Sequence, residues 1–268
     1  QHYLEVIMIG FNHLGQHGRL GNQMFQYAAL RGIAAARGYD FCIPQSDFVD
    51  EWKDHQLFET FKLPHNNNRG YQLQPDYYQE KQFHYDQEYV DNCPDQICLF
   101  GYFQTERYFE NIADSIREDY TFHDEIVETC TEFIEQVDNP LALHVRRTDY
   151  VSKAADHPPC SSEYYQEALS KFDDDRNVIV FSDDPVWCKE QSIFSSDRFM
   201  VAEGNDNRYD LCLMSLCKDF IIANSSFSWW GAWLANRGGV VAPARWFGEG
   251  YTAKNDTRDI VPSNWLKV

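Results

Sequence analysis

The sequence predicts an α/β protein whose C-terminal half holds a doubly wound parallel sheet. From residue 141 to 242, short apolar, β-branched runs alternate with helical patterns. Strands joined through helices run parallel with right-handed crossovers, so helices are expected on both faces of the sheet. Polar clusters follow several of these runs directly, at the edge where open parallel sheets bind ligands.

Six short buried strands are expected, at 4–10, 97–103, 141–145, 177–182, 219–223 and 238–242. The clearest helical pattern is 124–137, where apolar side chains recur on one face. Ser161 and Ser162 are typical caps and predict a second helix that continues to about residue 172. Residues 44–96 are rich in Gln, Asn, Asp, Tyr and Pro, which predicts irregular structure.

The chain length of 268 residues allows one large domain or two compact ones. The best candidate boundary is the turn Asp138-Asn139-Pro140, because the residue before a proline is disfavoured in a helix and a new strand follows directly. We therefore expect an N-terminal lobe at 1–138 and a C-terminal lobe at 139–268, with a cleft between them.

Composition excludes several classes of function. The net charge of -19 argues against a nucleic-acid partner, since phosphate backbones are held by basic stripes. An anionic ligand would need a local basic site. No apolar run approaches the ~20 residues that span a bilayer, so no transmembrane segment is expected in this chain. The eight cysteines lack paired CxxC spacing, and no His or carboxylate group has metal-ligand spacing, so no metal cofactor is expected.

Four polar clusters follow predicted strands: GRLGNQ at 18–23, HVRRTD at 144–149, FSDD at 181–184 and NSSFS at 224–228. In HVRRTD, strand alternation places His144 and Arg146 on one face, whereas Arg147 begins the turn. Two guanidinium groups at a strand end suit a diphosphate, which they hold in bidentate fashion. The alternative is an ordinary surface ion pair with Asp149.

The cluster NSSFS lies between a strand and an apolar helix that contains several tryptophans, which we expect in the core. A helix cap needs one such residue, yet this stretch offers Asn224, Ser225, Ser226 and Ser228. Its amides and hydroxyls, together with the helix dipole, predict an anion site.

The two aspartates of FSDD have different expected roles. Asp184 precedes Pro185 and is a typical helix cap, whereas Asp183 is the better ligand candidate, for example for a guanine edge. Asp173-Asp174-Asp175 spells the D-x-D pattern of metal-dependent sugar-nucleotide sites, but it precedes a strand. It therefore lies at the wrong end of the sheet, and a solvated turn is expected.

The stretch GRLGNQ matches neither a P-loop nor a dinucleotide loop. Gly21 and its neighbouring glycine permit a close backbone approach, and Asn22 and Gln23 are suited to bind a sugar or acceptor hydroxyl. Simple turn chemistry explains the same residues equally well.

Five ordered stretches carry a resemblance to a known family: GRLGNQMFQYAA at 18–29, GYFQTERYF at 101–109, HVRRTDYV at 144–151, FSDD at 181–184 and ANSSFSWWGAWLA at 223–235. Together they resemble the α-1,2-fucosyltransferases, and they extend over most of the chain. One departure is visible, because Thr148 stands where many relatives have glycine.

The resemblance implies a GT-B fold of two facing Rossmann-like lobes. The C-terminal lobe would bind GDP-fucose and the N-terminal lobe would help to bind the acceptor. Fucose would be transferred with inversion, without a metal, to the 2-hydroxyl of a galactose-containing glycan.

The resemblance also implies residue roles. Arg146 would stabilise the leaving β-phosphate, and Arg147 would support it or brace the loop. Asp149 is a candidate base, with the orientation of an arginine as its alternative role. Donor contacts are expected from His144, Asp183, Asn224, Ser225, Ser226, Phe227 and Gly21. Asn22 would lie near fucose and the acceptor hydroxyl.

Two alternatives stay open. One is fucosyl transfer to a protein hydroxyl or to another sugar position, because Gly-Arg-x-Gly-Asn-Gln is also similar to a stretch of protein O-fucosyltransferases. The other is a glycan-binding protein without catalytic activity.

Overall fold

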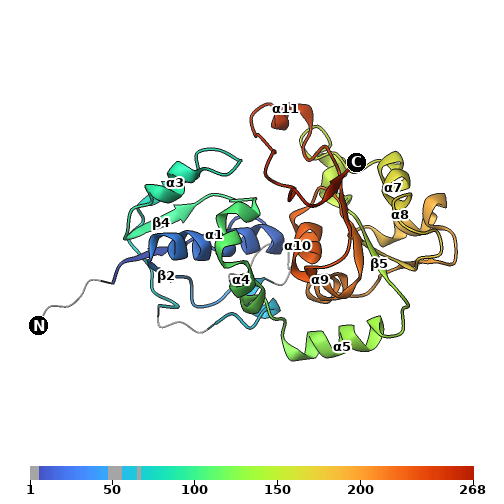
Figure 1. The fold of residues 1–268 in the computed structure, drawn as a ribbon, viewed down its shortest axis with the longest axis horizontal. Coiled ribbons are helices and arrows are strands. Elements are labelled where there is room, and N and C mark those ends of the chain that lie inside the picture. Colours follow the sequence, from blue (N-terminus) through green and yellow to red (C-terminus); the bar gives the residue numbers. More distant parts are fainter. Residues whose placement is uncertain (1–5, 48–55, 65–67) are drawn as a thin grey trace, which may run out of the picture. The chain divides into compact units, whose positions relative to one another are not determined.

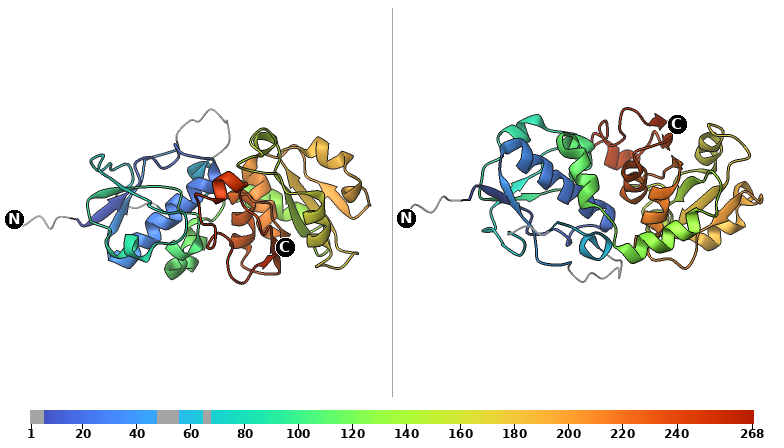
Figure 2. Two further views of the ribbon diagram at one scale, coloured as in Figure 1. Left: turned by 90° about the horizontal axis from the view of Figure 1, so that it is seen from above. Right: turned by 60° about the horizontal axis from the view of Figure 1, so that its bottom comes forward.

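The computed structural model describes residues 6–47, 56–64 and 68–268, and the chain divides into two compact units (Figures 1 and 2). Unit 1 extends to Thr121 and takes up Asp256–Ile260, and unit 2 holds Phe122–Asn255 and Val261–Val268. The structure thus places α5 (Asp124–Ile134) in unit 2, whereas the predicted boundary follows this helix. The reason is packing, because α5 lies against α9 (Asn207–Leu216) of the same unit.

Unit 1 contains a four-stranded parallel sheet in the order β2-β1-β4-β3. Its strands are β1 (Met8–Gly10), β2 (Asp40–Cys42), β3 (Tyr77–Gln79) and β4 (Ile97–Phe100). The long helix α1 (Leu20–Arg37) connects β1 to β2 and packs on the sheet (Figure 1). The strand order reverses between β1 and β4, which is the switch point of this sheet.

The remaining helices of unit 1 are short. They are α2 (Leu57–Thr60), α3 (Gln87–Asp91), α4 (Ala113–Asp119) and two 3-10 turns at Glu106–Tyr108 and Glu110–Ile112.

Unit 2 contains a six-stranded parallel sheet in the order β10-β9-β8-β5-β6-β7. This order confirms the doubly wound sheet, since the chain builds outward from β5 on both sides. Its switch point lies between β5 and β8. The strands are β5 (Leu141–Val145), β6 (Val178–Ser182), β7 (Phe199–Val201), β8 (Asp219–Ile221), β9 (Val240–Ala242) and β10 (Leu266–Lys267).

The helices of unit 2 connect these strands. Besides α5 and α9 they are α6 (Thr148–Ser152), α7 (Ser162–Leu169), α8 (Pro185–Glu190), α10 (Ser226–Ala235) and α11 (Glu249–Thr252), with a 3-10 turn at Ser192–Phe194. Ser161 caps α7 by accepting from the Tyr164 amide, which confirms one predicted helix start.

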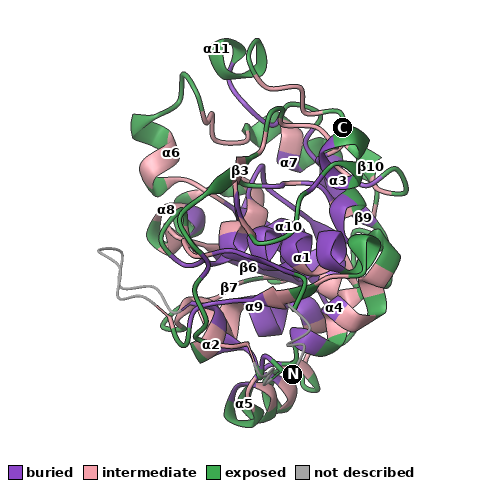
Figure 3. Ribbon diagram, turned by 90° about the vertical axis from the view of Figure 1, so that its left-hand side faces the viewer, coloured by how far each residue is buried: buried purple, intermediate pink, exposed green. Residues whose placement is uncertain are grey.

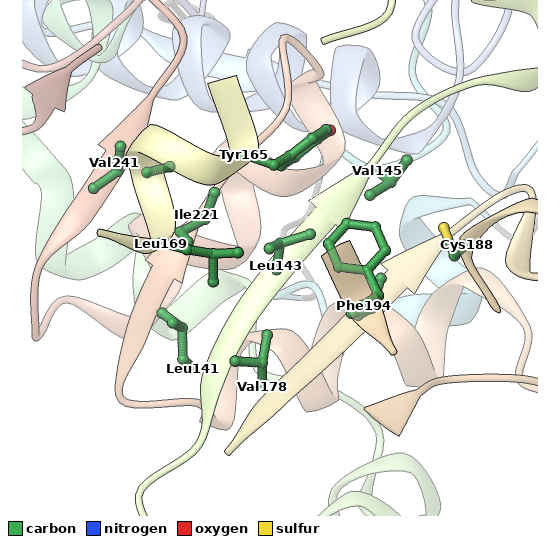
Figure 4. Packing of buried hydrophobic residues seen from close by; sticks show 12 residues of the cluster. Leu141, Leu143, Val145, Tyr165, Leu169, Val178, Cys188, Phe194, Ile221 and Val241 are labelled. Carbon is green, nitrogen blue, oxygen red and sulfur yellow. The ribbon is translucent and has the colours of Figure 1, made fainter. Parts of the chain in front are cut away.

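The core of unit 2 is built on alternate residues of its central strands. Leu141, Leu143 and Val145 of β5 pack with Val178 of β6 and with side chains from α7 (Figure 4). Figure 3 shows β6 and most of α10 in the colour of buried residues. Trp229 and Trp230 of α10 are fully buried, which confirms their predicted place in the core.

All six predicted strands are present, although several are shorter than expected. The four strands that the sequence did not reveal, β2, β3, β7 and β10, are the edge strands of the two sheets. An edge strand is only partly buried, so it lacks the continuous apolar run that marks a central strand. Within 44–96, the described residues include α2, β3 and α3, so the segment is less irregular than predicted, while 48–55 and 65–67 lie outside the described residues.

No helix in the described residues is long and apolar enough to cross a membrane. All eight cysteines carry free thiols.

Gly32 marks a close backbone approach that α1 needs in order to pack. A methyl group at this position would overlap the carbonyl of Tyr108 and lie 2.7 Å from Cα of Phe109. We predict that Gly32→Ala lowers the free energy of unfolding by about 1–3 kcal/mol or more. The matched control is Gly250→Ala in α11, where an added methyl group meets nothing within 4 Å. Equal thermal stability of the two variants would contradict the prediction.

Candidate functional site

The switch point of the unit 2 sheet gathers three of the four predicted clusters. Val145 pairs with Ser182 of β6, and Leu143 pairs with Ile221 of β8. The segments that follow these strands, 146–149, 183–184 and 224–228, therefore emerge at one edge of the sheet. The sequence placed all three after strands, and the strand order makes them neighbours.

Arg146 is fixed by two carboxylates. Its Nη1 lies 2.9 Å from Oδ2 of Asp183, and its Nη2 donates to Oδ1 of Asp149 at 2.5 Å. The side chain is only 14% exposed. A guanidinium has more N–H donors than these two contacts use, so Arg146 is held in one orientation and still has donors for a ligand.

Asp183 ties down the turn that carries the arginines. Its carboxylate accepts from the amides of Arg147 and Thr148, at 2.9 and 3.2 Å, and from the Thr148 hydroxyl at 2.5 Å. Burial opposes ionisation of Asp183, but Arg146 and these donors outweigh it, so the pKa of Asp183 lies below its usual value. Together with the contact to Arg146, these bonds give the Asp183 carboxylate four partners within the protein. Thr148 supplies a side-chain bond that glycine would not.

Arg147 points away from Arg146, as its position in the turn predicted. Its Nε lies 3.4 Å from Oδ2 of Asp184, and its guanidinium carbon lies 3.8 Å from the ring centroid of Trp187. Asp184 also accepts from the Trp187 amide and so caps α8, which confirms the expected cap before Pro185. Arg147 thus braces the loop between β6 and α8.

His144 is a neutral, buried side chain beside the turn. Only 5% of it is exposed, and burial lowers its pKa to about 4, although Asp183 acts in the opposite direction. Its ring centroid lies 5.7 Å from that of Phe227. Nδ1 of His144 is buried and has no hydrogen-bond partner in the part of the chain that the structure describes.

The start of α10 forms the other side of this edge. Ser225 is the N-cap, and its hydroxyl accepts from the Phe227 amide at 3.3 Å. Ser226 and Phe227 form the first turn of α10 and are partly exposed. The first amides of a helix and its dipole favour an anion here.

The side chain of Asn224, a predicted donor contact, is held by hydrogen bonds within the protein. It is 2% exposed, and its Nδ2 donates to the carbonyls of Pro158 and Trp246, both at 2.9 Å. The Cys160 thiol lies 3.5 Å from its Oδ1. The side chain therefore braces two loops behind the site.

Tyr150 joins the arginine turn to the start of α10, and the sequence did not single it out. Its ring centroid lies 5.3 Å from the guanidinium carbon of Arg146, and its hydroxyl donates to the carbonyl of Asn224 at 3.0 Å. One side chain thus contacts both loops, so Arg146 and the N-terminus of α10 lie on the same side of unit 2. The only sequence feature that could have indicated Tyr150 is its position inside the HVRRTDYV stretch.

In unit 1 the fourth cluster lies at the switch point of the smaller sheet. Asn22, in the first turn of α1, accepts from Nε2 of Gln104 at 2.6 Å, and Gln104 follows β4. Gly18 has a φ of 82° and lies against Asn22, where any side chain would collide with it. Gly21 is buried one residue before Asn22. These contacts link the loops after β1 and β4.

Glu80 holds the turn that presents Gln104. Its two carboxylate oxygens accept from the amides of Tyr102 and Phe103, at 2.8 and 3.1 Å. Burial raises the pKa of Glu80 to about 7 despite these two bonds. Gly101 has a φ of 157° and leaves no room for a Cβ beside Glu80. No sequence pattern indicated this role, because Glu80 lies in the segment expected to be irregular.

In the described ranges, no group of three His, Cys, Asp or Glu side chains is arranged to hold a metal ion. Asp173, Asp174 and Asp175 lie between α7 and β6, at the amino end of that strand, as predicted.

Comparison with known proteins identifies the family. The model of glycosyl transferase family 11 matches residues 1–268. The chain belongs to this family. It is 32% identical to an alpha-1,2-colitosyltransferase of Escherichia coli, over 94% of this chain and 96% of the relative. It is 28% identical to galactoside alpha-(1,2)-fucosyltransferase 2 of Pongo pygmaeus, over 81% of this chain and 67% of the relative.

The fold agrees with this assignment. The NodZ alpha-1,6-fucosyltransferase, in a crystal soaked with GDP-fucose, matches with a TM-score of 0.55 at 11% identity, over 85% of this chain and 92% of the neighbour. At this identity the match concerns the fold, which confirms the expected two-unit architecture of GT-B type for the family 11 chain.

Glu80 makes the stability of unit 1 depend on pH. Its pKa is raised from 4.5 to about 7, so the folded state binds the proton more tightly than the unfolded state. The stabilisation is complete below about pH 4.5 and is lost as the pH rises through about 7. We predict that Glu80→Gln, which is neutral throughout, flattens the fall in unfolding free energy over this range.

The measurement is denaturant unfolding of both proteins from pH 4.5 to 8. Asp210 of unit 2, whose pKa burial raises to about 6, is common to both proteins and cancels in the difference. Parallel pH profiles for the wild type and the variant would refute the assignment to Glu80.

Proposed function

We propose that the protein transfers fucose from GDP-fucose to the 2-hydroxyl of a galactose-containing glycan, with inversion and without a metal ion. The observation that carries the proposal is the position of Arg146, held by two carboxylates at the switch point of the unit 2 sheet, beside the N-terminus of α10. Membership of family 11, with relatives named as α-1,2 fucosyl- and colitosyltransferases, supports the same chemistry.

The donor diphosphate is the ligand that suits this edge. Ligands of open parallel sheets bind at the switch point, outside the carboxyl ends of the strands. Here the remaining N–H donors of Arg146 and the first turn of α10 supply directed hydrogen bonds to phosphate oxygens. POFUT1, whose solved structure has a similar fold, has been crystallised in complex with GDP-fucose, which supports such a donor here.

Arg146 would act on the leaving group. When the acceptor hydroxyl attacks the anomeric carbon from the face opposite GDP, the bond to the β-phosphate oxygen breaks and negative charge grows on that oxygen. The proton of the attacking hydroxyl passes to solvent water. A guanidinium already fixed by Asp149 and Asp183 stabilises this charge without reorganising. Since Oδ1 of Asp149 contacts Arg146, we propose that Asp149 orients the arginine, and an oxocarbenium-like transition state reduces the demand for a strong base.

The other residues divide into contact and support. His144 has a buried, unpartnered Nδ1 beside Phe227, and we propose that this pair contacts the nucleoside. Ser225 and Ser226 present the helix start to the diphosphate. Arg147, Asp183 and Asn224 support the loops through contacts within the protein. Asn22 and Gly21 of unit 1 are assigned to the acceptor side.

A second donor has a specific observation in its favour. The relative with 32% identity is named a colitosyltransferase, and colitose is a fucose that lacks one hydroxyl group. A site that hydrogen-bonds this hydroxyl would discriminate strongly against the deoxy sugar. GDP-colitose is therefore the alternative donor.

The deciding experiment incubates the protein with GDP-fucose or GDP-colitose, a panel of galactosides and EDTA, followed by mass and NMR analysis of the product. We expect an α-1,2-linked fucosyl galactoside at a rate that EDTA leaves unchanged. Transfer from GDP-colitose alone would replace the proposed donor. Donor binding without any product on a galactoside would exclude the proposed acceptor.

Arg146 offers a direct test of the leaving-group role. We predict that Arg146→Ala lowers kcat by about 10²–10³-fold, as expected for the loss of one donor to a developing charge. Arg146→Lys keeps the charge but lacks the guanidinium fork, so it should recover only part of the rate. The control is Arg198→Ala. Arg198 directly precedes β7 and so lies at the amino end of that strand, away from the carboxyl ends that carry the candidate site. Near-normal kcat in a folded Arg146→Ala protein would remove the residue from the mechanism.

A further inference from the structure

A cluster of four aromatic rings in unit 1 has no part in the chemistry described so far. We name His13, His17, Tyr77 and Phe100 the aromatic platform. His13 is its centre, with ring centroids 5.5 Å from His17, 5.2 Å from Tyr77 and 5.9 Å from Phe100. Phe100 also lies 5.2 Å from His17 and 5.9 Å from Tyr77.

The aromatic platform lies at the switch point of the unit 1 sheet. His13 and His17 belong to the loop after β1, and Phe100 ends β4, the strand beyond the reversal of strand order. Tyr77 of β3 pairs with Cys98 of β4, so its side chain lies on the same face of the sheet as that of Phe100. A switch point is where an open parallel sheet binds ligands.

The rings are accessible and yet held in place. Tyr77 is 40% exposed and His17 is also exposed, so the platform adds little to the buried core. Nε2 of His13 lies 2.7 Å from the Tyr77 hydroxyl, and its Nδ1 lies 3.0 Å from Oε1 of Gln16. Exposed rings fixed by hydrogen bonds present an apolar face with polar groups at its edge.

The platform adjoins the residue assigned to the acceptor. The carbonyl of His17 accepts from Nε2 of Gln26 in α1, which fixes the loop against that helix. The next residue, Gly18, lies directly against the side chain of Asn22. A sugar placed at Asn22 would therefore have its neighbouring ring, or its own apolar face, within reach of the platform.

We propose that the aromatic platform binds a pyranose ring of the acceptor glycan. This inference rests on the proposed function and extends it by naming a subsite for the acceptor. The axial 4-hydroxyl of a galactoside leaves one face of the ring lined by C–H groups, and such a face packs on an aromatic ring. Tyrosine and histidine combine this apolar surface with polar atoms for the sugar hydroxyls.

The test compares Tyr77→Ala and Tyr77→Phe with the wild type, with Tyr71→Ala as control. Tyr71 is an exposed tyrosine of unit 1 outside the platform. The KM for methyl β-galactoside and for lactose is measured at saturating GDP-fucose, together with the KM for GDP-fucose and its slow hydrolysis by water.

For Tyr77→Ala we expect the KM of an acceptor to rise about five- to tenfold, as for the loss of one aromatic contact. The KM for GDP-fucose and the hydrolysis rate should stay unchanged. Tyr77→Phe keeps the ring and should lie near the wild type, and Tyr71→Ala should match it. If the KM rises for both acceptors, galactose lies on the platform. If the KM rises for lactose alone, the second sugar lies there.

Unchanged KM values for both acceptors in a folded Tyr77→Ala protein would refute acceptor binding by the platform and would leave the proposed function intact. If the wild type transfers to no galactoside, the proposed function fails instead. Calorimetric titration of lactose into wild type and Tyr77→Ala then decides the platform separately, since equal affinities would reject it.

Discussion

The contact on which the candidate site depends is the pair of carboxylates that holds Arg146. Asp149 and Asp183 approach the guanidinium from different segments, one from the same turn and one from the end of the neighbouring strand. They can do so because β5 and β6 pair in register up to Val145 and Ser182. The parallel sheet thus fixes a charged side chain at the edge where a ligand binds, and the cost of burying the arginine is offset by its partners.

This arrangement also bears on how an acidic protein would bind the proposed anionic donor. Across the turn and the start of α8, Asp149, Asp183 and Asp184 offset the charges of Arg146 and Arg147, and the whole chain carries a charge of -19. Net positive potential is therefore not the proposed source of recognition. We propose that directed N–H groups of Arg146 and of the first turn of α10 supply it, and Tyr150 contacts both segments.

Much of this organisation follows from the sequence, because a ligand edge concentrates polar residues after apolar runs. The convergence of three clusters was predictable for that reason. Apolar runs predicted the central strands, and residue type predicted the caps Ser161 and Asp184. The edge strands were not, since a half-exposed strand of three residues has no distinctive pattern. The partners of Asn224 and Asp183 within the protein, such as the carbonyl of Trp246, could not be predicted, because sequence shows only the residue type and the fold determines what it contacts. Glu80 acquires its role from burial, which no local pattern reveals.

The decisive measurement is a crystal structure of the protein with GDP. We expect the two phosphates to lie at the carboxyl ends of β5 and β8, within hydrogen-bond distance of Arg146 and of backbone amides in the first turn of α10. Phosphates bound at any other edge of unit 2, with Arg146 contacting only Asp149 and Asp183, would contradict it.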